Sequence, residues 1–377
     1  MFYKNARIFT SDNTFHTGAF EVTQDGFFGQ ILPADCPADA VDLQGATVIP
    51  GLIDVHIHGA MGKDFSDGDY AGLAAMAQYL LKSGITSFAP ASMTLPYEVL
   101  AKAFANGRRF ADNAPADCAR LMGVHMEGPY FCTKQKGAQN AAYLKDPDFE
   151  GFQKLYADCG GLVRIVDLAP ELPGSEAFVA KAKDLCTVSV AHTDANYDEA
   201  KAAFDAGATH LTHMFNAMPP IAHRNPGVIP AAAENKSVRV ELIGDGFHVL
   251  PPVVRLAFAL FGADRIVVVS DALRCCGMPE GAYELGGQTV YKSEEIARLA
   301  DGTVAGSITN LYQCLQRLLS YGIDEAAAVQ ATTYNPACAI GAQDKVGSIA
   351  TGKYADFLVC SPDYSTKRVF RGGKEIV

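Results

Sequence analysis

Between residues 51 and 340, short apolar runs alternate with stretches in which apolar residues recur every three or four positions. The apolar runs are rich in β-branched residues and predict eight strands: Leu52–His56, Ile85–Ala89, Leu121–His125, Leu162–Leu168, Cys186–His192, Thr209–His213, Val238–Ile243 and Arg265–Ser270. The amphipathic stretches between most of them predict helices: Gly72–Lys82, Glu98–Phe110, Phe149–Cys159, Ser175–Asp184 and Asp198–Asp205. This order predicts an α/β protein with a (β/α)₈ TIM-like barrel over residues 51–345, because about 250 residues suffice for such a barrel. A doubly wound sheet is the alternative, but no glycine-rich phosphate fingerprint follows the first strand.

The two ends of the chain follow a different pattern. Residues 1–50 and 346–377 alternate apolar and polar positions around turn signals such as Asp25-Gly26 and Gly372-Gly373. We expect these ends to pair and form one small β-sandwich domain from both termini. A glycine-punctuated stretch from Tyr283 to Gly306 predicts a β-hairpin after the last barrel strand.

Composition narrows the possible partners. The chain is 49% hydrophobic and 19% charged, which suits a folded protein with a large core. Its net charge of −11 argues against nucleic acid as a partner. The N-terminus has no signal-like pattern, and no apolar run approaches a membrane span, so we expect a cytoplasmic protein with no membrane partner. The ten scattered cysteines indicate reduced thiols.

Chemically active side chains gather at the ends of predicted strands. They are His56 and His58 after the first strand, Glu127 after the third, His192 and His213 at the fifth and sixth, and Asp271 after the eighth. In a TIM-like barrel the carboxyl ends of the strands form the active-site face. His56 and His58 lie two positions apart, so both imidazoles point to the same side of an extended strand and can share a cation. The set predicts a metal centre.

Other histidines have a simpler interpretation. His16 and His223 are expected to be ordinary surface or core residues. His210 precedes His213 by three positions, an odd spacing that would turn it toward the helices. Gly128-Pro129 is expected to break the third strand just after Glu127.

A metal centre with a nearby aspartate predicts hydrolysis. A divalent cation acidifies bound water, so that hydroxide is available at neutral pH, and it polarises a carbonyl oxygen. Asp271 can accept the proton of the water and deliver it to a leaving amine. We therefore expect amide or ester hydrolysis without a covalent intermediate.

Several phrases of the sequence carry a resemblance to a known family. They are Pro50-Gly51-Leu52-Ile53-Asp54 before the His56-x-His58 pair, His125-Met126-Glu127-Gly128-Pro129-Tyr130, Thr212-His213-Met214-Phe215-Asn216-Ala217-Met218, Arg224-Asn225-Pro226-Gly227, Asp245-Gly246-Phe247-His248, Ser270-Asp271-Ala272, Leu299 to Ser307 and Asn335-Pro336-Ala337. The chain resembles the N-acetylglucosamine-6-phosphate deacetylase family of the amidohydrolase superfamily from about residue 42 to 360. Glu127 takes the place of the carbamylated lysine that many superfamily members use.

The resemblance implies roles for individual residues. Glu127, His192 and His213 would hold the metal that all members share, and His56 with His58 would hold a second one. Two divalent ions per subunit are therefore expected, zinc first, with iron, manganese or cobalt as alternatives. The substrate, a small phosphorylated amino sugar, would be contacted by Asn216, Ala217, Arg224 and His248. Arg224 would reach it across the interface of a homodimer.

One position departs from the family pattern. The family has Lys-Gly-Ala-His where this chain has Lys136-Gly137-Ala138-Gln139. Gln139 is expected to bind substrate, but an amide cannot become a cation. The first hypothesis is hydrolysis of N-acetylglucosamine 6-phosphate to glucosamine 6-phosphate and acetate. The second is a related substrate such as N-acetylgalactosamine 6-phosphate or another amide, and the third is a non-enzymatic scaffold.

Overall fold

The computed structural model describes all residues from 1 to 377, and its central part is built from parallel strands. They are β6 (Leu52–Ile57), β9 (Ile85–Pro90), β11 (Val124–Tyr130), β12 (Val163–Leu168), β13 (Thr187–Val190), β14 (His210–Leu211), β15 (Arg239–Ile243) and β16 (Ile266–Val269). Each of the eight predicted strands is therefore present. A short strand β10 (Arg120–Leu121) precedes β11 and pairs with β9.

The parallel strands form two hydrogen-bonded arcs, β10-β9-β6 and β11-β12-β13-β14-β15-β16. A bridge between Ala91 and His125 joins the arcs on one side. On the other side, the Asp271 N–H after β16 donates to the His56 oxygen of β6 at 2.9 Å. The strands are almost wholly buried, as expected where helices cover parallel strands.

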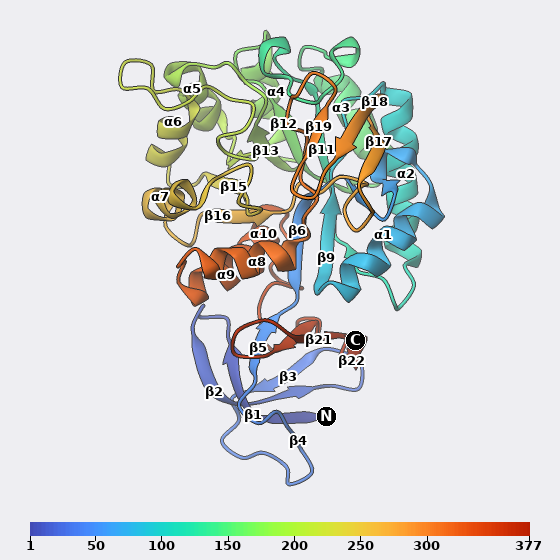
Figure 1. Cartoon of the computed structure of the whole chain (residues 1–377), viewed down its shortest axis with the longest axis vertical. Coiled ribbons are helices and arrows are strands. Elements are labelled where there is room, and N and C mark those ends of the chain that lie inside the picture. The colour runs from blue at the N-terminus through green and yellow to red at the C-terminus, as the bar shows by residue number, and fades with distance from the viewer.

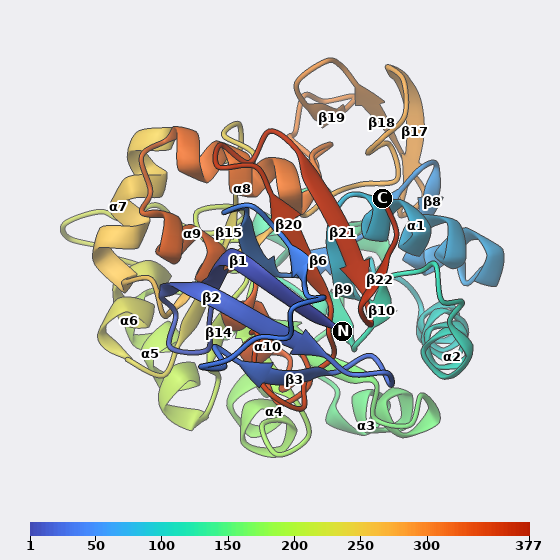
Figure 2. The same ribbon diagram turned by 90° about the horizontal axis from the view of Figure 1, so that it is seen from below.

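The helices surround these strands (Figure 2). The five predicted helices are α1 (Tyr70–Lys82), α2 (Tyr97–Asn113), α3 (Phe149–Asp158), α4 (Ser175–Ala182) and α5 (Tyr197–Ala206). Later in the chain follow α6 (Val228–Glu234), α7 (Pro251–Phe261), α8 (Leu311–Ser320), α9 (Glu325–Thr332) and α10 (Tyr334–Ala339). Side-chain caps explain where several begin: Asp69 accepts from the first turn of α1, and Asn196 forms a capping box with Glu199 in α5.

Strands from both ends of the chain form a separate sheet at the bottom of Figure 1. They are β1 (Phe2–Phe9), β2 (Phe15–Val22), β3 (Phe28–Ile31), β4 (Val41–Asp42), β5 (Thr47–Pro50), β20 (Phe357–Cys360), β21 (Lys367–Arg371) and β22 (Lys374–Glu375). The order is β22-β21-β20-β5-β1-β2-β3, so β5 and β20 join the two ends of the chain. Aromatic side chains form its core, with Phe357 stacked on Phe370 and Tyr3 on Phe20.

Two local expectations need correction. The third strand does not end at Gly128-Pro129: β11 runs on to Tyr130, although its pairing with β12 is interrupted after Met126. The stretch after β16 is a three-stranded antiparallel sheet rather than a simple hairpin, with strands β17 (Gly281–Leu285), β18 (Gln288–Lys292) and β19 (Ala297–Leu299). A further small hairpin, β7 (Gly59–Ala60) and β8 (Lys63–Asp64), follows β6.

All ten cysteines are free thiols. None of the helices combines the length and the apolar character needed to cross a membrane.

Candidate active site

A pocket of about 580 Å³ lies where the parallel strands end. Its volume is in the range that small-molecule sites have. Its walls include residues from β11, from the loops after β13, β14 and β16, and from the end of β17. Among them are His58, Glu127, Lys136, Gln139, His192, His213, Asn216, Ala217, His248, Asp271, Leu285 and Thr303.

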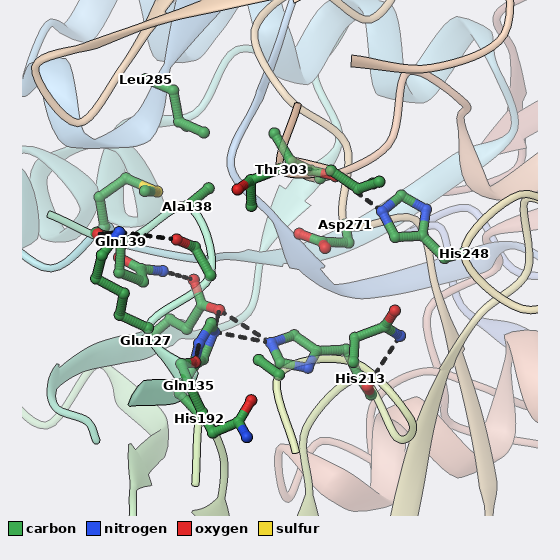
Figure 3. Close-up of a pocket in the computed structure, with 18 of the residues that line it drawn as sticks. Glu127, Gln135, Ala138, Gln139, His192, His213, His248, Asp271, Leu285 and Thr303 are labelled. Carbon is green, nitrogen blue, oxygen red and sulfur yellow. Dashed lines mark hydrogen bonds and ion pairs between the residues drawn. The ribbon is translucent and has the colours of Figure 1, made fainter. Parts of the chain in front are cut away.

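Glu127, His192 and His213 converge on one point of this pocket (Figure 3). The Nε2 atoms of His192 and His213 lie 3.0 and 3.3 Å from Glu127 Oε1, and 3.1 Å from each other. Three ligands of one tetrahedral zinc ion, at about 2.0–2.1 Å from the metal, would lie about 3.3 Å apart. His192 Nδ1 lies 2.9 Å from the Gln135 carbonyl oxygen and donates to it, so Nε2 is free to ligate. The donor set therefore fits a divalent cation.

His56, His58 and Asp271 form a second group beside the first. The Nε2 atoms of His56 and His58 lie 3.5 and 3.3 Å from Asp271 Oδ1. His58 Nε2 is also 3.2 Å from Glu127 Oε2, so Glu127 stands between the two groups. His56 Nε2 is buried without a hydrogen-bond partner, which suits a ligand atom. This group fits a second cation.

The two carboxylates give the site a negative potential. Burial alone would lower the pKa of His58, but Glu127 and Asp271 raise it to about 10. Burial alone would raise the pKa of Glu127, but the charge of His58 and hydrogen bonds from His192 and His213 hold it well below its ordinary value. The site thus favours positive charge, which a metal cation can supply in place of protons.

Three of these side chains follow an unusual backbone turn. His192, His213 and Asp271 have φ angles of 44°, 30° and 48°, in the left-handed region that non-glycine residues seldom adopt. Such strain is common at functional sites, where the surrounding structure holds it. For Asp271 that support is visible: its N–H donates to His56, and its carbonyl accepts from Ser307 at 2.7 Å. A Cβ on Gly306 would lie 2.5 Å from this carbonyl, so only glycine allows the approach.

The residues predicted to contact substrate are divided between the pocket and the surface. Gln139, Asn216, Ala217 and His248 line the pocket. Arg224 does not line the pocket. It is exposed, and its Nη1 lies 2.9 Å from Nε2 of His223, the preceding residue in the chain. Every predicted site residue except Arg224 and His56 therefore lines one pocket, and His56 is buried beside it, against Asp271.

His248 is held at both ring nitrogens. Nδ1 lies 2.6 Å from Asp245 Oδ2, and Nε2 lies 2.8 Å from the Ala305 carbonyl oxygen. Both partners are acceptors, so both nitrogens donate and the ring is a cation. Burial opposes this charge, but Asp245 raises the pKa of His248 above its ordinary value.

Two side chains at the site are not expected from the sequence, and a third lies elsewhere than expected. Glu241 of β15 is fully buried, and its Oε2 accepts from His56 Nδ1 at 2.8 Å and from the His213 N–H at 3.1 Å. His210 does not face the helices; its Nε2 lies 3.2 Å from Oε1 of Glu241, a buried side chain of the neighbouring strand β15. Lys136, close to Gln139 in the sequence, also lines the pocket and is the second residue that the sequence does not predict. The available signal for Glu241 was a glutamate inside the apolar run Val238–Ile243, since charged side chains are seldom buried unless they have partners.

Comparison with known families places this geometry in context. The model of the amidohydrolase family matches residues 47–260 and 264–376, which is nearly the whole chain. The matched region contains all of the residues named in the pocket.

Individual relatives are similar over almost their full length. The chain is 34% identical to the N-acetylglucosamine-6-phosphate deacetylase of Bacillus subtilis, covering 96% of this chain and 90% of that one. It is 30% identical to the N-acetylgalactosamine-6-phosphate deacetylase of Escherichia coli O157:H7, over 93% and 92% of the two chains. Among solved structures, an aspartate-to-alanine variant of N-acetyl-D-glucosamine-6-phosphate deacetylase from Mycobacterium smegmatis, in complex with N-acetyl-D-glucosamine-6-phosphate, matches with a TM-score of 0.93. That match has 31% identity and covers 100% and 99% of the two chains.

Proposed function

This chain belongs to the amidohydrolase family, and we propose that it hydrolyses N-acetylglucosamine 6-phosphate to glucosamine 6-phosphate and acetate. The observation that carries the proposal is the convergence of Glu127, His192 and His213 beside Asp271 in one pocket. The third hypothesis, a non-enzymatic scaffold, has no support, because the candidate metal ligands and Asp271 are all present and close together.

Two groups of side chains would hold divalent cations. Glu127, His192 and His213 form one, and His56 and His58 with Asp271 form the other. Zinc suits imidazole and carboxylate ligands, as do iron, manganese and cobalt. The cation supplies Lewis acidity, which polarises the acetamide carbonyl and makes water more acidic.

Asp271 is the proton carrier in this proposal. Burial would raise the pKa of its carboxyl group, but the charges of His56 and His58 hold it below its ordinary value. Asp271 is therefore an anion at neutral pH and can accept a proton from the attacking water. It then gives that proton to the amine as the C–N bond breaks.

Binding of the phosphate requires positive charge. Within one chain, the His248 cation and Lys136 line the pocket. We propose that Arg224, which lies outside the pocket of its own chain, serves the pocket of the second subunit in a homodimer. Its guanidinium suits a phosphate because it donates in a planar fork. Asn216 and Ala217 would contact the sugar or the phosphate.

A second candidate substrate is N-acetylgalactosamine 6-phosphate. The observation that favours it is the 30% identity to the N-acetylgalactosamine-6-phosphate deacetylase of Escherichia coli O157:H7. The two sugars differ at a single hydroxyl group, so the same metal and proton chemistry serves both.

An acetate-release assay tests these proposals. Zinc-loaded protein is given N-acetylglucosamine 6-phosphate, its galactosamine epimer and unphosphorylated N-acetylglucosamine. The expected kcat/KM is highest for the first and lowest for the third, and a chelator should abolish turnover. Preference for the epimer would support the second candidate, and no acetate from any substrate would refute both.

We also propose a division of the chain into two domains. Residues 51–345 would form a closed (β/α)₈ barrel, and residues 1–50 with 346–377 would form a small β-sandwich around the aromatic core of Phe20, Phe357 and Phe370. We also propose that the protein functions in a reducing compartment such as the cytoplasm, and its ten free thiols support this proposal.

A further inference from the structure

Gln139 is fixed at both ends of its side-chain amide. Its Oε1 accepts from the Thr94 backbone N–H at 2.8 Å, and its Nε2 donates to Glu127 Oε2 at 2.7 Å. Only 3% of the residue is exposed. In the reverse orientation, the amide oxygen would face the Glu127 carboxylate and the NH₂ group would face the Thr94 N–H. Both contacts would be repulsive, so the two partners determine the orientation of the amide.

The partner of Gln139 is the carboxylate of Glu127, which belongs to one cation group and contacts the other. Glu127 Oε1 faces His192 and His213, while Oε2 faces His58 Nε2 at 3.2 Å. Rotation of the carboxylate about its last bond would change which oxygen each group receives. Gln139 is the neutral donor that opposes this rotation (Figure 3), and Thr94 in turn holds Gln139.

We infer that Gln139 is a positioning residue that orients Glu127 toward the cations, rather than a residue whose main role is to bind the sugar. The inference rests on the metal dependence in the proposed function. An amide N–H donates whether or not a cation or a substrate is present, so the carboxylate is oriented before either binds. Hydrogen-bond partners of metal ligands contribute about 10- to 100-fold in metal affinity.

Zinc titration of the metal-free protein against a chromophoric chelator tests this role. Gln139→Leu, which keeps the bulk and loses both hydrogen bonds, should weaken zinc binding about 10- to 100-fold. Gln139→His, which restores a donor, should recover at least part of the loss. Gln330→Leu is the control, because the Gln330 amide contacts Asn335 and no residue of the pocket.

Steady-state kinetics at saturating zinc separates this role from substrate binding. We expect the KM of Gln139→Leu to stay close to that of the unmodified protein, because excess zinc then fills the metal sites in spite of their lower affinity. Unchanged zinc affinity together with a raised KM would overturn the inference. If Gln139→Leu does not fold, Gln139→Asn takes its place: its amide is too short to span Thr94 and Glu127, and unchanged zinc affinity would again count against us. A protein that binds zinc normally but releases no acetate would refute the proposed function and leave this inference standing.

Discussion

At the scale of single residues, the site depends on which atom of each side chain faces the pocket. His56 offers Nε2 because its Nδ1 is held by Glu241, and His192 offers Nε2 because its Nδ1 is held by a carbonyl oxygen. The sequence identifies the ligand residues, but these partners lie 185 and 57 positions away along the chain. No local pattern contains such information.

Asp271→Asn tests the proton carrier. The amide keeps the size and one acceptor oxygen of the carboxylate but cannot take up a proton at neutral pH. We expect kcat to fall about 10²- to 10⁴-fold, the usual contribution of general acid–base catalysis, while zinc at Glu127, His192 and His213 is retained. Stopped assays for acetate and elemental analysis measure the two quantities. Retained turnover would exclude Asp271 as the proton carrier.

Glu241→Gln tests the support beneath His56. Loss of the charge weakens the hydrogen bond that sets the imidazole tautomer, so zinc affinity should drop about 10- to 100-fold. Asp167→Asn is the matched control, since Asp167 is equally buried but contacts His125 and Thr212 instead of a predicted ligand. Equal zinc affinities of the two variants would contradict the assigned role.

At the scale of elements, the periodic pattern was sufficient to predict the strands and helices. It did not predict the backbone conformation where the strands end. Alternation along a strand predicts that His210 and His213 face opposite ways. The backbone leaves the strand conformation at His213, with φ of 30°, so both side chains turn toward the inside. The alternation rule applies only while the chain stays extended.

The small antiparallel sheet of β17, β18 and β19 is expected to help close the pocket. Leu285 at the end of β17 lines the pocket, and Gln288 Nε2 donates to the Ala138 oxygen at 2.6 Å, next to Gln139. Removal of this hydrogen bond in Gln288→Ala should raise KM about 3- to 10-fold, with kcat and zinc affinity unchanged. Tyr291→Ala, on an exposed position of the same sheet, serves as control, and identical KM values would refute the prediction.

At the scale of the whole molecule, the ion pair between Arg120 and Asp356 is one of those that join the terminal sheet to the rest of the chain. Arg120 of β10 donates to Asp356 at 2.7 Å, and the Gly372 N–H donates to the same carboxylate at 2.7 Å. The Asp356 side chain is only 3% exposed. A carboxylate so placed depends on its partners for solvation.

Asp356→Asn should therefore lower the free energy of unfolding by about 1–3 kcal/mol. Urea denaturation of the zinc-loaded protein measures it. Glu375→Gln is the contrast: it breaks the exposed pair with Arg368, which should contribute at most about 1 kcal/mol. Equal losses in the two variants would show that burial of Asp356 contributes nothing.

The proposed homodimer has its own test. Arg224→Ala should raise KM about 10- to 100-fold if the guanidinium binds phosphate. Random mixing of Arg224→Ala and Asp271→Asn subunits makes half of the dimers mixed, each with one complete site, so about a quarter of normal activity should return. If the mixture were no more active than the two single variants assayed separately, Arg224 would not act across an interface.

The sequence by itself determined the eight parallel strands, the five helices between them and the residue types at the strand ends. These follow from local periodicity and from the rule that such strands present their carboxyl ends on one face. Only the tertiary structure decided that Glu241 supports His56, that Gln139 holds Glu127 and that Arg224 lies outside its own pocket. These relations depend on contacts between distant segments and on the left-handed turns at His192, His213 and Asp271, where alternation no longer tells which way a side chain points.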